Sequence, residues 1–303
     1  MINIRDFDGW NIYDGASEGS GRSEKVWLMS KDGDIGLFKF PKIDPATSQE
    51  TTEHISEHLA HQIGEILGVS TANVDIGTYH GRIGSMSYLV SQPNEYLKEG
   101  IGFISGIYPN YDADKMVDTS SGKYYCLEHI LQSTYEIVSR DVWIEMMVFD
   151  FLIGNADRHQ SNWAILELSG EPWEKREVRK CPLYDNGSSL CCYVNDKQLD
   201  RMFGKDAGPF NALVDTKSRS IIRIDGSRKA QPRHREVVKY LLSEYPETHD
   251  ICVRFIKKLN NDIIDNLVDV YQSEILSLGK NKLIRRFLKR KLEILGELLQ
   301  GDD

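Results

Sequence analysis

The sequence predicts an α+β fold in which a small strand-rich part is followed by a larger helical part. Residues 24–30 and 34–40 are apolar runs separated by a short Asp-Gly turn, which is typical of a β-hairpin because Gly adopts positive φ at low cost. Apolar residues then recur at helical spacing over 48–68. From about residue 124 onward the pattern is mainly helical.

The helix predicted over residues 48–68 has candidate signals at both ends. Thr47 and Glu50 have the spacing of a capping box, in which each side chain satisfies a free backbone N–H of the first turn. Gly68 follows the last periodic residue, where a left-handed glycine commonly ends a helix. We therefore expect the helix to begin after Thr47 and to end at Gly68.

Two further strands and a loop-rich stretch complete the first third of the chain. Strands are predicted over 70–79 and 85–91, and the glycine-rich segment 92–123 is expected to form loops. The boundary between the two parts then falls just before Pro93. The expected division is a strand-rich lobe over 1–91 and a helical lobe over 92–303.

Helices are expected throughout the second part. Residues 140–153 are apolar almost all round, which indicates a helix buried on every side. Further helices are predicted over 234–247, 249–259, 261–277 and 280–299.

The last of these helices is amphipathic and basic. We interpret its basic face as solvated, and a face that docks a partner or substrate is the alternative. The basic side chains are Lys280, Lys282, Arg285, Arg286, Lys289, Arg290 and Lys291.

Composition limits the class of protein. Of 303 residues, 37 are Lys or Arg and 46 are Asp or Glu, so the net charge is −9. This argues against direct nucleic-acid binding, which needs a basic surface. No apolar run approaches the roughly 20 residues of a membrane span, and the N-terminus lacks a signal-peptide pattern. Five cysteines without a C-x-x-C pair are typical of reduced thiols, so we expect a cytoplasmic location, with secretion or translocation into another cell left open.

Two short motifs carry the strongest chemical signal. Asp157 and Asn162 lie five residues apart in Asn-Ala-Asp-Arg-His-Gln-Ser-Asn, and Asp185 begins a later Asp-Asn-Gly. Phosphoryl transfer needs a carboxylate that takes the proton of the acceptor hydroxyl. It also needs an amide oxygen and a second carboxylate that hold Mg²⁺ on the nucleotide phosphates. The spacing matches that requirement, whereas an ordinary polar turn explains only one motif at a time.

Other residues are candidates for the same chemistry. Lys39 lies in an apolar strand, from which a lysine can reach nucleotide phosphates and pair with a helix glutamate. Glu53 and Glu57 are both available for that pairing, and we favour Glu53. His159 is a candidate for stabilising transferred charge or orienting Asp157, and a structural role is equally consistent with the sequence.

A Gly/Ser-rich segment over residues 14–25 precedes the hairpin. Its small residues would let backbone N–H groups approach phosphates, with Ser17 and Ser20 inside the loop. It does not have the Walker pattern G-x-x-x-x-G-K-[ST], so a P-loop enzyme is disfavoured.

Taken together, these motifs resemble those of the HipA-like serine/threonine protein kinases. The resemblance runs in order from about residue 14 to 295. The matching motifs are Leu37-Phe38-Lys39-Phe40-Pro41, Glu53, Asn155-Ala156-Asp157-Arg158-His159 with Asn162, and Tyr184-Asp185.

The resemblance implies a two-lobed protein-kinase-like fold and a Mg-ATP-dependent kinase acting on a protein substrate. In that family Asp157 would be the catalytic base, Asn162 and Asp185 would bind Mg²⁺, and Lys39 would contact the phosphates of ATP. The hinge that meets adenine would be residues 89–92, which include Leu89, Val90 and Ser91.

The resemblance also carries expectations about regulation. Autophosphorylation of a serine in the nucleotide loop, here Ser17 or Ser20, would switch activity off. A small antitoxin-like protein is a conceivable regulator, but the chain begins close to the nucleotide loop and has no room for the extra N-terminal subdomain of larger toxin members. We therefore expect it to be closer to the short stand-alone members.

Three alternatives remain from the sequence. A phosphatidylinositol-type lipid kinase has a similar D-R-H-x-x-N and D-x-G pair, and aminoglycoside-type kinases share the Asp-to-Asn spacing. The third is a catalytically silent binding module with a kinase fold.

Overall fold

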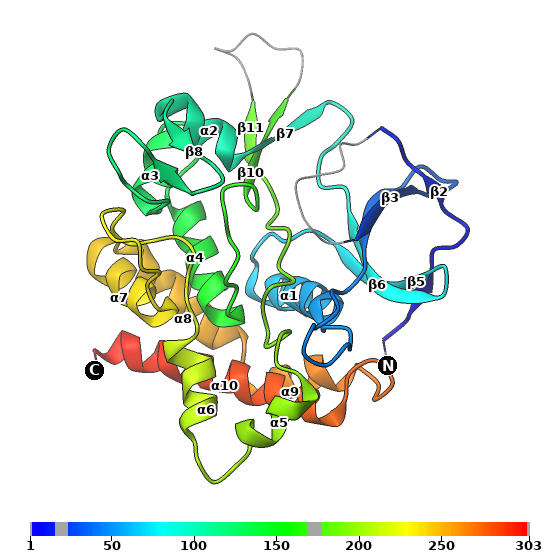
Figure 1. Cartoon of the computed structure of the whole chain (residues 1–303). Coiled ribbons are helices and arrows are strands. Elements are labelled where there is room, and N and C mark those ends of the chain that lie inside the picture. Colours follow the sequence, from blue (N-terminus) through cyan, green and yellow to red (C-terminus); the bar gives the residue numbers. More distant parts are fainter. Residues whose placement is uncertain (1, 16–23, 169–176, 302–303) are drawn as a thin grey trace. The chain divides into compact units, whose positions relative to one another are not determined.

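The structure is a computed structural model of the chain that describes residues 2–15, 24–168 and 177–301 (Figure 1). Ser17 and Ser20 lie outside the described residues. The chain divides into two units. The first comprises residues 1–90, 184–210 and 259–289, and the second comprises 91–183, 211–258 and 290–303.

The first unit contains a six-stranded sheet in the order β1-β5-β6-β4-β3-β2 (Figure 1). β1 is parallel to β5, and the other pairs are antiparallel. The strands are β1 (Arg5–Asp6), β2 (Asn11–Ile12), β3 (Lys25–Met29), β4 (Ile35–Lys39), β5 (Val74–Tyr79) and β6 (Arg82–Tyr88). The predicted Asp-Gly hairpin is confirmed between β3 and β4, where Gly33 has a φ of 91°.

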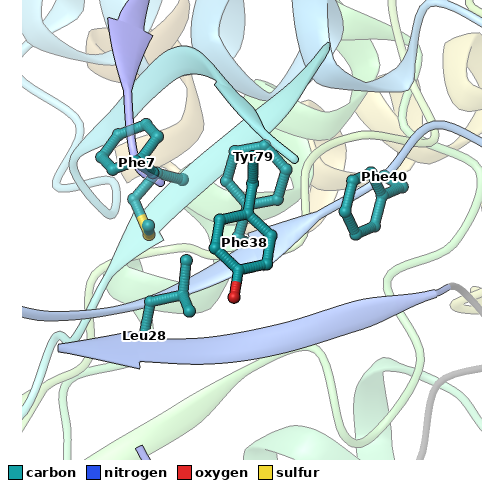
Figure 2. Packing of buried hydrophobic residues seen from close by; sticks show 6 residues of the cluster. Phe7, Leu28, Phe38, Phe40 and Tyr79 are labelled. Carbon is teal, nitrogen blue, oxygen red and sulfur yellow. The ribbon is translucent and has the colours of Figure 1, made fainter. Parts of the chain in front are cut away.

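Aromatic side chains form a buried cluster on the sheet of the first unit. Phe38 of β4 is fully buried, and its ring lies 5.7 Å from that of Phe7 and 5.8 Å from that of Tyr79 (Figure 2). Leu28, Phe40 and Met86 complete the buried cluster. Because side chains alternate along a strand, Lys39 projects to the face of β4 opposite Phe38.

Helix α1 (Glu53–Leu67) packs against β5 and β6. Its end at Gly68 is confirmed, since Gly68 has a φ of 74° and its N–H bonds to the Glu65 carbonyl. The predicted start is wrong. The helix begins at Glu53, and Thr47 instead lies in a turn where its hydroxyl accepts from the N–H of Gln49 at 3.4 Å.

The remaining helices of the first unit are α5 (Asp196–Met202) and α9 (Asn261–Asp269). The helix predicted over 261–277 therefore ends early. Helices α6 (Gly208–Asn211) and α10 (Leu278–Gln300) each contribute residues to both units.

The second unit is mainly helical. The predicted buried helix is confirmed as α4 (Asp141–Ile153), which packs against α7 (His234–Glu244) and α8 (Glu247–Lys258). A three-stranded antiparallel sheet has the order β11-β10-β7, with β7 at Glu95–Glu99, β10 at Ala164–Leu168 and β11 at Val178–Lys180.

The segment expected to be loop-rich also contains short elements. They are α2 (Gly100–Ile107), β8 (Tyr111–Asp112) and β9 (Val117–Asp118), followed by α3 (Leu127–Ser133). A π-helical turn spans Ala212–Thr216. Among the described residues, no helix has the length and apolar character needed to cross a membrane.

The basic side chains of α10 are largely paired within the chain. Lys289 Nζ lies 2.7 Å from a carboxylate oxygen of Asp265, and Arg285 lies 3.6 Å from the same side chain. Arg290 pairs with Glu297 at 2.7 Å. The solvated basic face that we expected is therefore partly neutralised by neighbouring carboxylates, and the structure adds no support for a docking role.

Candidate functional site

In the first unit, Lys39 and Asp185 form an ion pair. Lys39 Nζ donates to Asp185 Oδ1 at 2.8 Å, although the residues are 146 positions apart in sequence. The lysine comes from the end of β4, and the aspartate follows Tyr184 in the segment that returns to this unit. The structure thus brings together two of the predicted site residues.

The surroundings keep Lys39 charged. Burial lowers the pKa of Lys39, but the nearby carboxylates of Asp185 and Glu57 raise it by more, so the net pKa lies well above the usual range of lysine. A lysine held in this state is a fixed positive charge, which is the property that phosphate binding requires.

Glu57 of α1 holds the Asp-Asn-Gly segment. Its side chain is 2% exposed, and Oε1 accepts from the backbone N–H of Asn186 at 3.0 Å. A Cβ atom added at Gly187 would lie 3.0 Å from the other carboxylate oxygen, so the glycine permits this close approach. Glu57 therefore fixes the loop next to Asp185 and adds to the negative field at Lys39.

The prediction that Glu53 pairs with Lys39 is wrong. Glu53 accepts from Lys42 Nζ and from the Tyr193 hydroxyl, both at 2.8 Å. Burial raises the pKa of Glu53, but the hydrogen bonds from Lys42 and Tyr193 outweigh it and leave the pKa lowered. Because α1 begins at Glu53, this residue faces the preceding loop, and Glu57 one turn later faces the Asp-Asn-Gly segment.

Asp185 has an unusual backbone conformation. Its φ is 56°, in the left-handed region that Asp and Asn enter more readily than other non-glycine residues. Its side chain is 44% exposed, so the carboxylate is accessible as well as paired with Lys39. Strained, accessible polar residues of this kind occur often at functional sites.

In the second unit, the loop with the first motif directly follows α4. Gly154 ends the helix in the left-handed conformation, and Asn155 Oδ1 accepts from the backbone N–H of Asp157 at 3.0 Å. Asn162 Nδ2 donates to the Asp157 carbonyl at 2.7 Å. The loop therefore closes on itself around Asp157, which is half-buried.

The bond to Asp157 orients the Asn162 amide. Its nitrogen is engaged with the Asp157 carbonyl, and within the described residues Oδ1 has no hydrogen-bond donor. An amide oxygen and a carboxylate such as that of Asp185 are hard donors of the type Mg²⁺ prefers. The donor chemistry of both residues fits the predicted ion, and the described residues contain no cluster of three or more His, Cys, Asp or Glu suited to a metal.

A buried ion pair stabilises the same loop. Arg158 is 1% exposed, and its Nε and Nη2 donate to the two carboxylate oxygens of Asp150 at 3.0 and 2.8 Å. Its Nη1 donates to the Asn162 carbonyl at 2.8 Å. Sequence reasoning missed Asp150, although a carboxylate inside the apolar stretch 146–153 was an available signal.

His159 takes part in the fold of the loop. Its Nδ1 accepts from the Ser161 N–H at 3.2 Å, and its carbonyl accepts from the Asn162 N–H at 2.9 Å. These contacts are those of a structural residue. The ring is half-buried, and a catalytic role for it remains a prediction.

The predicted hinge residues lie at the end of the first unit and the start of the second. The Leu89 N–H donates to the Ile35 carbonyl at 2.9 Å, and Leu89 is 42% exposed. Val90 is the last residue of the first segment, and Ser91 begins the next. Their contact with adenine remains a prediction.

No protein-family profile matches the chain. A curated relative, the serine/threonine-protein kinase CtkA of Helicobacter pylori, is 24% identical in an alignment 297 residues long that covers 90% of this chain and 86% of the relative.

Two solved structures share the fold. The proinflammatory kinase CtkA of Helicobacter pylori matches with a TM-score of 0.79 and 19% identity, covering 99% of this chain and all of that one. The toxin HipA of Shewanella oneidensis, solved with HipB and operator DNA, matches with a TM-score of 0.56 and 11% identity, covering 99% and 69%. The predicted α+β kinase-like fold and the resemblance to HipA-like kinases are thereby confirmed.

Proposed function

We propose that this protein is a Mg-ATP-dependent kinase that phosphorylates serine or threonine residues of proteins. The likeness to a serine/threonine-protein kinase over nine-tenths of the chain supports a phosphotransferase. The observation that carries the proposal is the self-closed loop in which Asn162 holds the Asp157 carbonyl at 2.7 Å and keeps its own amide oxygen for a ligand.

Most of the predicted residues have a proposed role. Asp157 accepts the proton of the acceptor hydroxyl. Lys39 binds the nucleotide phosphates, and its ion pair with Asp185 weakens when the nucleotide binds. Asn162 and Asp185 hold Mg²⁺, which neutralises charge on the phosphates when it is bound. The segment around Leu89, Val90 and Ser91 is the proposed adenine contact. Glu57 replaces Glu53 as the residue that supports the lysine and the Asp-Asn-Gly loop.

The nature of the acceptor is the first point to test. With γ-labelled ATP and Mg²⁺, we expect label on a generic protein substrate and none on phosphatidylinositol vesicles, because the net charge of −9 disfavours an anionic lipid surface. Labelled lipid with unlabelled protein would favour the lipid-kinase alternative. A thermal shift with Mg-ATP but no transfer to either acceptor would favour a silent binding module.

Autophosphorylation of the nucleotide loop is a second proposal. After incubation with Mg-ATP, we expect mass spectrometry to find phosphate on Ser17 or Ser20. We also expect the modified protein to bind ATP more weakly, because a group of about −1.5 to −2 charge would compete with the nucleotide phosphates. Alanine at both positions serves as the control that keeps its ATP affinity. An active wild type without phosphate on either serine would contradict this switch.

We further propose a cytoplasmic location. Four cysteines, Cys126, Cys181, Cys192 and Cys252, are buried and form no disulfide, as expected for a protein kept in a reducing compartment. A small HipB-like regulator is a further candidate partner, supported only by the likeness to HipA.

A further inference from the structure

A buried polar chain connects α10 to the loop that carries Asp157. His234, the first residue of α7, is 1% exposed, and its Nε2 lies 3.0 Å from the Asn155 carbonyl. Its Nδ1 lies 3.0 Å from the Ser218 hydroxyl. Lys291 Nζ lies 2.9 Å from the same hydroxyl. All four residues belong to the second unit.

The chemistry of these groups permits one arrangement of protons. The Asn155 carbonyl can only accept, so His234 Nε2 must carry the proton and donate. In a neutral imidazole Nδ1 is then an acceptor, and Ser218 must donate its hydroxyl proton to it. The Ser218 oxygen in turn accepts from Lys291, which can only donate. The chain of donors therefore runs from Lys291 to Ser218 and on to Nδ1, while Nε2 donates separately to Asn155.

The surroundings keep the imidazole neutral. Burial and the Lys291 cation lower the pKa of His234 to about 3. Lys291 is itself 1% exposed, so it is no part of the solvated basic face predicted for α10. Its ammonium also lies 4.5 Å from the ring centroid of Phe151 in α4.

This chain of hydrogen bonds ends at Asn155, the residue that binds the backbone of Asp157. Asn155 is 1% exposed and its Oδ1 accepts from the Asp157 N–H at 3.0 Å. Its Nδ2 donates to Asp150 at 3.1 Å. The bond from the His234 ring to the Asn155 backbone carbonyl adds a third contact, so that Asn155 is held from both α4 and α7.

We propose that His234 is a positioning residue for Asp157, with Ser218 and Lys291 selecting the tautomer that donates to Asn155. This rests on the proposed function, in which Asp157 is the catalytic base. Small displacements of a catalytic group cost rate steeply, so a residue without substrate contact can affect kcat.

Two substitutions of His234 separate positioning from packing. In His234→Gln the terminal amide reaches the place of Nε2 and can still donate to Asn155. In His234→Asn the shorter side chain reaches only the place of Nδ1 and loses that bond. Both variants remove the ring, so each serves as the stability control of the other.

We expect His234→Asn to lower kcat by about ten-fold or more with little change in KM for ATP, and His234→Gln to stay within about three-fold of wild type. Equal kcat values for two variants of equal thermal stability would overturn the proposal. If neither variant folds, Ser218→Ala provides the test. It removes the hydroxyl that donates to Nδ1, which weakens the preference for the tautomer with the proton on Nε2, and it should lower kcat several-fold. An unchanged kcat in Ser218→Ala would then contradict the proposal.

The tautomer of His234 can be measured without an activity assay. Nitrogen-15 NMR of the wild type should show His234 neutral, with the proton on Nε2, and a proton on Nδ1 would overturn the hydrogen-bond chain. A wild type without kinase activity would refute the proposed function and the role in positioning a base. The NMR result would still decide the chain itself, so the two failures are distinguishable.

Discussion

Replacing Asp157 by alanine is expected to lower kcat for phosphate transfer by about 10²–10⁴-fold, the usual contribution of a positioned general base. KM for ATP should change little, because the proposed phosphate and metal contacts come from Lys39, Asn162 and Asp185. The loop should keep its bonds from Asn155 and Asn162, since both use the backbone N–H and carbonyl of Asp157.

Steady-state rates with γ-labelled ATP and a protein substrate measure this effect. Asp114, an exposed aspartate in the same unit, provides a matched control, and Asp114→Ala should retain wild-type kcat. Asp185→Asn should instead weaken the Mg²⁺ dependence of ATP binding. An Asp157→Ala protein with more than about a tenth of wild-type kcat would rule out Asp157 as the base.

Replacing Arg158 by methionine is expected to lower the free energy of unfolding by about 3–5 kcal/mol, because Asp150 would be left as an unpaired buried charge. Both side chains are almost inaccessible, at 1% and 4% exposure. The Asn162 carbonyl would also lose its donor, so activity should fall together with stability.

Urea denaturation of a double-mutant cycle isolates this effect. The double variant Asp150→Asn/Arg158→Met has no unpaired buried charge, and Asn155 keeps an acceptor at position 150. We expect its free energy of unfolding to exceed that of Arg158→Met by about 2 kcal/mol or more. Lys123→Met breaks an exposed pair with Glu128 and should cost no more than about 1 kcal/mol. A loss below that limit for Arg158→Met would show that the buried pair does not brace the loop.

Much of the fold could be predicted from local sequence patterns. The apolar run of α4, the Asp-Gly hairpin and the left-handed Gly68 each depend on neighbours in sequence, and all three are confirmed. β7 was missed because Glu-Tyr-Leu-Lys-Glu lacks a strand pattern, and it forms a strand through pairing with β10 some 70 residues later. The start of α1 was misplaced because turns around Thr47 satisfy the backbone before the helix begins.

In the candidate site, too, local sequence predicts some features, and others depend on distant contacts. Spacing alone singled out Asp157, Asn162 and Asp185 as candidates, because phosphoryl transfer requires those residue types, and their roles stay predictions. It could not choose between Glu53 and Glu57, since that choice depends on which turn of α1 meets the Asp-Asn-Gly segment. His234 had no signal in the sequence, because its role depends on contacts 79 residues away along the chain.

The central claim is that this chain transfers phosphate from ATP to serine or threonine side chains. Phosphoamino-acid analysis of a protein substrate labelled by the wild type with γ-labelled ATP tests it most directly. We predict acid-stable phosphoserine or phosphothreonine that requires Mg²⁺ and is missing when Asp157→Ala is used. Nucleotide binding by the wild type without any such product, or equal labelling by the variant, would contradict the claim.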